Sequence, residues 1–232
     1  MKIEIWSDFV CPFCYIGKRR LETALQSFPQ RDEVTVAYRS FELDPNAEKA
    51  TGKGKAELLA SKYNVSLEQA EGMCENMRQQ AENEGLTFDF KNMKPTNSFD
   101  SHRLLQFAAK HDLMEKMAER LFYAYFTETE DISDLDTLCN LAEEVGLDRA
   151  EVNDVLSSEE FSKEVRFDES LGSQLGIQGV PFYVFNEKYA VSGAQPPEMF
   201  QQALNKAWEE DKQLQVITSE GDACGTDSCD IK

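Results

Sequence analysis

Apolar and polar residues alternate at the start of the chain and then recur at helical spacing. In KIEIWS, Ile3 and Ile5 point to one face, and this period of two predicts a strand. A seam with spacings of three and four residues follows, which predicts a helix with one buried face: Cys14, Gly17, Leu21, Ala24 and Phe28. The segment EVTVAYRSFEL is rich in β-branched and aromatic residues and predicts a second strand. A strand, a helix and a strand in this order form a right-handed parallel unit.

The middle of the chain has a different pattern. From Ala56 to about Leu175 the periodicity is helical throughout, with turn signals between the segments. The predicted helices lie in AELLASKYNV, SLEQAEGMCENMRQQAENEG, SFDSHRLLQFAAKHD, LMEKMAERLFYAYFTE, SDLDTLCNLAEEVG and SSEEFSKEVRFDESLGSQLG. The strand signal then returns in PFYVFN and YAVSG, which predict a hairpin, and PPEMFQQALNKAWEED predicts a closing helix.

This order predicts an α/β fold with the layout βαβ…ββα, interrupted by a helical insert. We expect residues 1–50 and 177–212 to form one domain and residues 51–176 to form the insert domain. Residues 213–232 are polar and Gly-rich, and they form a C-terminal tail in this scheme.

Charge and hydropathy exclude several classes of partner. The chain has 232 residues with 24 Lys and Arg against 43 Asp and Glu, a net charge of −19, which repels nucleic acid. No stretch reaches the roughly 20 apolar residues of a membrane helix. The N-terminal segment lacks the basic start and apolar run of a secretory signal, so we expect a cytoplasmic protein. Paired cysteines in that reducing compartment are typically redox-active or metal-bound.

Candidate chemistry lies in the segment SDFVCPFCYIGKRR, where two cysteines flank Pro12 and Phe13. Proline suits the first position of a helix, which makes Cys11 the N-cap. Backbone amides and the helix dipole favour a thiolate there, so Cys11 is the expected nucleophile. Cys14 lies one turn further along the buried seam and is expected to resolve a mixed disulfide.

A zinc site is the main structural alternative for such a pair. Tetrahedral zinc needs two further ligands, and His102 and His111 are poorly spaced to provide them. A permanent disulfide across so short a loop would stabilise little. We therefore expect no metal and no organic cofactor, because a dithiol itself carries two electrons.

Three sequence blocks together resemble the DsbA-like thioredoxin superfamily, in its cytoplasmic FrnE branch. They are SDFVCPFCYIGKRRL, PTNSFDSHRLLQFAAK and GVPFYVFNEKYAVSGAQ, within a similarity that spans roughly residues 3 to 210. The resemblance implies a thioredoxin fold with a helical insert. It also implies a cis Pro181 that faces the cysteine pair, and pairing of the Val180 backbone with an extended substrate segment.

The expected function is that of a thiol–disulfide oxidoreductase acting on disulfide-containing or thiol proteins, with glutathione or a thioredoxin-type protein as candidate reductant. Phe13 is expected to form an apolar rim for substrates. The resemblance places His102 beside the substrate cleft, with an ordinary surface or interface histidine as the alternative. The alternative is a glutathione-dependent isomerase or transferase of the 2-hydroxychromene-2-carboxylate isomerase or kappa class. Those relatives generally have Ser where this chain has Cys11. A non-enzymatic alternative is a metal-binding or holdase-like protein. The sequence does not indicate an oligomeric state.

A second cysteine pair lies in the tail. In DACGTDSCD, four residues separate Cys224 from Cys229, and small residues between them allow a disulfide to close. Nearby aspartates disfavour free thiolates. We expect a second redox pair that exchanges with Cys11, with an incidental pair or a shared zinc site as alternatives.

Overall fold

The structure is a computed structural model that describes residues 1–49 and 52–211. Its strands are β1 (Lys2–Ser7), β2 (Thr35–Ser40), β3 (Phe182–Phe185) and β4 (Tyr189–Ser192). The helices at the two ends of the chain are α1 (Pro12–Gln26) and α9 (Pro197–Asp211), with a short 3-10 helix at Arg31–Glu33. Between β2 and β3 lie α2 (Lys55–Tyr63), α3 (Leu67–Asn83), α4 (Phe99–Ala109), α5 (Met114–Phe126), α6 (Leu135–Val145), α7 (Arg149–Leu156) and α8 (Ser162–Gln174).

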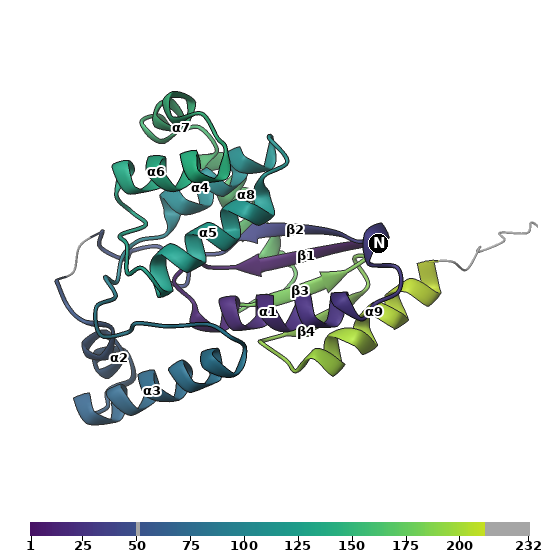
Figure 1. Ribbon diagram of the computed structural model, residues 1–232, viewed down its shortest axis with the longest axis horizontal. Helices are drawn as coiled ribbons and strands as arrows, with labels where there is room; N and C mark the ends of the chain where they lie inside the picture. Colours follow the sequence, from purple (N-terminus) through teal and green to yellow (C-terminus); the bar gives the residue numbers. More distant parts are fainter. Residues whose placement is uncertain (50–51, 212–232) are drawn as a thin grey trace, which may run out of the picture.

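The four strands form one mixed sheet in the order β2-β1-β3-β4 (Figure 1). β1 pairs in parallel with β2, and Ile5 lies opposite Tyr38. On its other side β1 is antiparallel to β3, which forms the hairpin with β4. α1 and α9 pack against each other, and α9 also contacts β3 and β4. The alternating Ile3 and Ile5 are buried, as the strand pattern predicts. The expected thioredoxin-type arrangement, βαβ…ββα with a helical insert, is therefore confirmed.

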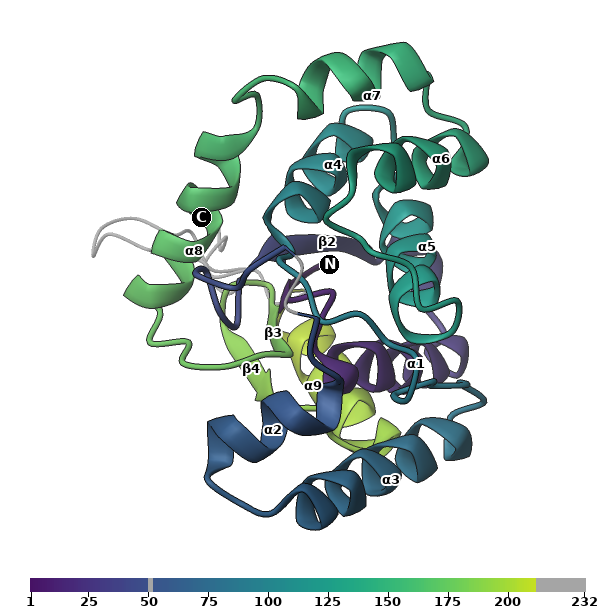
Figure 2. The same ribbon diagram turned by 90° about the vertical axis from the view of Figure 1, so that its left-hand side faces the viewer.

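The insert consists of two groups of helices on either side of the start of α1. Figure 2 shows α2 and α3 together at the bottom and α4 to α8 together at the top. α3 contacts α1, whereas α5 and α8 contact β2. None of the helices in the described part of the chain is long and apolar enough to cross a membrane.

One part of the insert differs from the sequence prediction. The sequence pattern did not predict α7, and the single helix predicted over SSEEFSKEVRFDESLGSQLG begins only at Ser162. Arg103 of α4 explains the break, because its guanidinium donates to the carbonyl oxygens of Val155 at 2.6 Å and Glu160 at 2.9 Å. These bonds satisfy carbonyl groups that a continuous helix would use. Asp148 caps the start of α7 through the amides of Ala150 and Glu151.

Candidate active site

The first turn of α1 positions the two cysteines. Cys11 is the N-cap, with an extended backbone at φ −93° and ψ 113°, and Pro12 occupies the first helical position as predicted. The amide of Cys14 donates to the carbonyl oxygen of Cys11 at 3.1 Å. Both cysteines are free thiols. The local sequence alone dictates this geometry, because proline has no amide to lose at the first position of a helix.

The surroundings of Cys11 stabilise its thiolate. The Cys14 thiol is the largest influence and lowers the pKa of Cys11, burial acts against it, and the amides of Cys14 and Phe13 lower the pKa further. While protonated, the Cys11 thiol can donate to the carbonyl oxygen of Val180, 3.6 Å away, a contact that favours the thiol form and is outweighed by the groups that lower the pKa. Cys11 therefore has the properties of a nucleophilic thiol.

Cys14 has the opposite character. Its side chain is 3% exposed, as buried as that of Cys11 at 4%, so burial alone does not distinguish the two thiols. The Cys14 sulfur accepts a hydrogen bond from the Asp8 amide at 3.5 Å. Burial and the neighbouring Cys11 together raise the pKa of Cys14 well above that of a free cysteine. A protonated, buried thiol one turn behind a thiolate suits the second, resolving step of a disulfide exchange.

The loop before β3 completes the surface around Cys11. The Val180–Pro181 peptide bond is cis, as the resemblance implies. Pro181 also packs against α1, since a Cβ built on Gly17 would lie 3.2 Å from the Pro181 Cγ and 2.2 Å from the Tyr183 hydroxyl. A glycine at this point of the helix thus permits close contact between α1 and the proline loop.

A groove of about 440 Å³ lies beside the cysteine loop, between the two groups of insert helices. Its apolar walls and charged groups come from the cysteine loop, the segment after β2, α2, the segment before α4, and α5: Asp8, Val10, Leu43, Asp44, Ala47, Lys55, Leu58, Leu59, Ser61, Lys62, Pro95, Thr96, Ser98 and Tyr125. Phe13, predicted as an apolar rim, is 37% exposed next to the two cysteines. The sequence reading did not single out Lys55, at the start of α2.

His102 lies behind the groove, next to Asp8, which borders it. His102, predicted beside the substrate cleft, is only 1% exposed, so it lies behind the cysteine loop rather than on the surface. Its Nε2 lies 3.6 Å from the Asp8 Oδ1, and Asp8 is completely buried. The sequence analysis missed Asp8, although a carboxylate three residues before a reactive cysteine is a signal that a charge acts on the thiol.

Two further predictions concern groups elsewhere. Cys224 and Cys229, the predicted second redox pair, lie outside the described residues. Within residues 1–49 and 52–211, no cluster of His, Cys, Asp or Glu has the arrangement of a metal site.

Cys74 and Cys139 are buried in α3 and α6, and burial raises the pKa of each thiol. Thiols of this kind are unreactive, which leaves Cys11 and Cys14 as the redox-competent pair of the described chain.

Comparison with known proteins agrees with this geometry. Residues 2–205 match the family described as DSBA-like thioredoxin domain. The chain belongs to this family. It is 42% identical to the probable DsbA oxidoreductase SCO1869 from Streptomyces coelicolor, whose crystal structure superimposes with a TM-score of 0.88 over 100% of this chain and 99% of the other. It is also 27% identical to the uncharacterized protein YwbO of Bacillus subtilis (strain 168), over 88% of this chain and 95% of that protein.

A more distant structure shares the fold alone. A 2-hydroxychromene-2-carboxylate isomerase is 16% identical, with a TM-score of 0.65 over 91% of this chain and 98% of the other. Enzymes with different chemistry therefore use this DsbA-like architecture, and the fold cannot choose between them. The side chains at the start of α1 must do so.

Proposed function

We propose that the chain is a thiol–disulfide oxidoreductase of the FrnE-like branch in which Cys11 attacks and Cys14 resolves. The Cys11 thiolate attacks one sulfur of a substrate disulfide, forms a mixed disulfide and releases the other sulfur as a thiolate. Cys14 then loses its proton and attacks the Cys11 sulfur. This step forms the Cys11–Cys14 disulfide and releases the second substrate thiol, so two electrons pass to the substrate. In the opposite direction the same steps oxidise a dithiol.

The opposite pKa shifts of the two thiols carry this proposal. The pKa of Cys11 is lowered and that of Cys14 is raised, so one thiol is ready to attack while the other stays protonated until a mixed disulfide has formed. An isomerase that only holds glutathione needs no second thiol at this point of the helix. The second thiol therefore favours redox exchange over the isomerase or transferase alternative.

An extended segment of a disulfide-containing or thiol protein is the proposed substrate. The Val180 backbone lies next to the Cys11 sulfur and can pair with such a segment by strand addition, with Pro181 shaping that edge. Phe13 and the groove beside the cysteine loop would accept apolar side chains of the same segment. We further propose a cytoplasmic role, with glutathione or a thioredoxin-type protein restoring the dithiol.

Reduction of insulin disulfides tests this function. The wild-type protein with a thiol reductant should precipitate the insulin B chain, and Cys11→Ser should abolish the reaction. Cys14→Ser should trap a mixed disulfide that can be seen by mass spectrometry. A protein that catalyses glutathione-dependent isomerisation, retains it in Cys11→Ser and never reduces insulin would establish the alternative class. The reduction potential of the Cys11–Cys14 couple then gives the preferred direction against the cellular glutathione poise.

A further inference from the structure

A buried acid–base pair lies directly behind the cysteine loop. Asp8 is 0% exposed and His102 is 1% exposed, and their Oδ1 and Nε2 atoms are 3.6 Å apart. That distance suits an ion pair but is longer than a hydrogen bond. The two residues come from different parts of the fold, because Asp8 follows β1 whereas His102 lies in α4 of the insert.

The backbone fixes the position of the Asp8 carboxylate. Its Oδ2 accepts the Leu43 amide at 2.7 Å and its Oδ1 accepts the Val10 amide at 3.3 Å. The amide of Asp8 itself donates to the Cys14 sulfur, and its carbonyl oxygen accepts the Cys11 amide at 3.1 Å. Asp8 thus contacts both cysteines through its main chain, and its carboxylate is fixed next to the same loop by the Leu43 and Val10 amides.

No hydrogen bond within the described part of the chain holds the His102 imidazole in its position. Neither ring nitrogen has a hydrogen-bond partner among the described residues, although the ring is buried against Phe9 with centroids 5.0 Å apart. A neutral imidazole in this position would leave both of its polar atoms unpaired, which is costly in a protein interior. The Asp8 carboxylate lies at ion-pair distance from Nε2 and would offset the cost of a positive charge on this ring.

The charge on Asp8 acts on the attacking thiol. Burial raises the pKa of the Asp8 carboxyl, but His102 and the Leu43 amide outweigh burial and keep the carboxyl ionised. This negative charge in turn raises the pKa of Cys11 and so opposes its thiolate. Other ionisable groups also surround the Asp8–His102 pair. They are Cys11 and Cys14 in the first turn of α1, Glu42 after β2, Lys55 of α2 and Tyr125 of α5. Glu42 is itself paired with Arg166 of α8.

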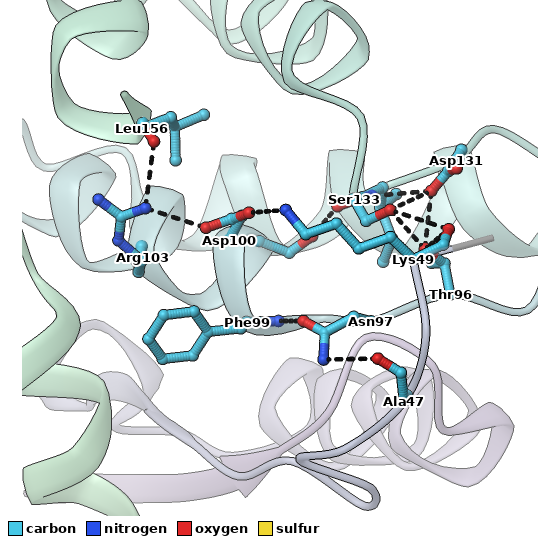
Figure 3. Close-up of polar contacts among 12 residues, drawn as sticks. Ala47, Lys49, Thr96, Asn97, Phe99, Asp100, Arg103, Asp131, Ser133 and Leu156 are labelled. Carbon is cyan, nitrogen blue, oxygen red and sulfur yellow. Dashed lines mark hydrogen bonds and ion pairs between the residues drawn. The ribbon is translucent and has the colours of Figure 1, made fainter. Parts of the chain in front are cut away.

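The contacts of the insert hold both partners of Asp8 in place. Figure 3 shows the segment after Leu43 attached to the segment before α4, with the Asn97 amide donating to the Ala47 carbonyl at 3.3 Å. The Lys49 ammonium binds the Asp100 carboxylate at 2.7 Å in the first turn of α4 (Figure 3). These contacts fix the loop that supplies the Leu43 amide relative to the helix that supplies His102.

We propose that Asp8 and His102 are a pair of positioning residues that set the reactivity of Cys11, with His102 supplying the positive charge that offsets the Asp8 carboxylate behind the thiolate. When His102 is protonated the pair is neutral towards Cys11. When His102 loses its proton the bare carboxylate repels the thiolate. Because such linkage is reciprocal, formation of the Cys11 thiolate also favours the protonated imidazole. A helix of the insert thereby takes part in the chemistry of the thioredoxin-like domain.

A thiolate titration by absorbance near 240 nm tests the pair in the reduced protein. Asp8→Asn should shift the Cys11 midpoint down by about one pH unit, the size expected from removal of a nearby like charge. His102→Gln should shift it up, because the carboxylate is then uncompensated. In the Asp8→Asn background, His102→Gln should lose most of its effect. An equal effect of His102→Gln in both backgrounds, or an unchanged midpoint in Asp8→Asn, would overturn the proposal.

Two control variants separate charge from structure. Asp168→Asn removes a carboxylate that is equally buried but pairs with Arg39 at 2.8 Å, away from the cysteines. It should lower thermal stability and leave the Cys11 titration in place. His111→Gln removes the other of the two histidines and should also leave it unchanged. The titration requires no turnover. If the titration contradicts the Asp8–His102 proposal, the proposed oxidoreductase function is unaffected. If the protein proves inactive towards disulfides, the titration can still detect the effect of the pair on Cys11.

Nuclear magnetic resonance tests the pair in the wild-type chain, without any variant at Asp8. The sequence has two histidines, so comparison with His111→Gln assigns the imidazole signals. The ring nitrogen shifts of His102 should follow the ionisation of Cys11 in the reduced protein and should change when the dithiol is oxidised. His102 signals that are identical in the oxidised and reduced proteins at every pH would refute the pair.

Discussion

The sulfur of Cys11 lies 3.6 Å from the carbonyl oxygen of Val180, although 169 residues separate the two in sequence. The antiparallel pairing of β1 with β3 creates this proximity, because it places the last residues of β1 beside the first residues of β3, at one end of these two strands. A substrate segment paired with the Val180 backbone would therefore present its own sulfur to Cys11. Attack and substrate binding would then share one surface.

The first prediction concerns the unequal acidity of the two thiols. Since its pKa is lowered, Cys11 should react with iodoacetamide at pH values below those that a free cysteine needs, whereas Cys14, with its raised pKa, should stay unmodified. Below both pKa values, each unit of pKa difference changes the thiolate fraction about tenfold, so the two rates should differ clearly. Peptide mass spectrometry after timed alkylation measures both rates. The unfolded protein is the control and should show similar rates, and similar rates in the folded protein would contradict the assigned roles.

The second prediction concerns the contact between α1 and the proline loop. In Gly17→Ala the new Cβ would lie 2.2 Å from the Tyr183 hydroxyl and 3.2 Å from the Pro181 Cγ, so the loop must shift. Overpacking of this kind costs about 1–3 kcal/mol. Insulin reduction should fall along with the free energy of unfolding, measured by urea denaturation.

Gly72→Ala is the matched control for this substitution. Gly72 also lies in a helix, α3, but no atom lies within 4 Å of a Cβ built there. Removal of a glycine from a helix interior should stabilise the protein by about 0.5–1 kcal/mol and leave turnover unchanged. If both variants behaved alike, the close contact of Gly17 would have no functional importance.

Local sequence patterns predicted the parts of the site that depend on neighbouring residues. Pro12 directly after Cys11 defines the start of α1, and alternation in KIEIWS defines β1, because both follow from short-range backbone preferences. The cis Pro181 needed the resemblance of a whole block, since no pattern in GVPFYVF distinguishes it from an ordinary proline.

Long-range contacts explain what the sequence did not predict. The break between α7 and α8 depends on the Arg103 side chain, which reaches from α4 to the carbonyl oxygens of Val155 and Ser158. The burial of His102 depends equally on the docking of α4 behind the cysteine loop. Helical periodicity shows which face of α4 is apolar, but it does not show that the Asp8 carboxylate lies next to His102 on that helix. The division of the insert into two groups also follows from tertiary packing.

The third prediction concerns the tail cysteines, Cys224 and Cys229, which lie outside the described residues. If they form a second redox pair that exchanges with Cys11, replacing both with serine should slow turnover of a protein disulfide and leave the Cys11 alkylation profile unchanged. Turnover at the wild-type rate with glutathione and with a thioredoxin-type reductant would exclude this exchange. Loss of stoichiometric zinc from the double variant would favour a metal site instead.

The fourth prediction concerns the contact between α5 and α1. Glu119 accepts the Tyr15 hydroxyl at 2.7 Å and binds Arg19 at 2.9 Å and Lys18 at 2.6 Å. Burial raises the pKa of Glu119, but Arg19 and Lys18 outweigh it and lower the pKa from 4.5 to about 2. A lowered carboxyl pKa stabilises the folded state above pH 4.5, and this stabilisation is lost as the pH falls towards 2.

Comparison of Glu119→Gln with the wild type should reveal this stabilisation. The side chain is 34% exposed, so solvent screening reduces the expected loss at pH 7 to about 1–2 kcal/mol. The difference between the two proteins should shrink steadily in urea titrations between pH 4.5 and pH 2.5, because protonation removes the charge from the wild-type carboxylate as well. Glu209→Gln, at an exposed carboxylate of α9, should show no such trend. A destabilisation of Glu119→Gln that is independent of pH would mean that packing, and not the ion pairs, joins α5 to α1.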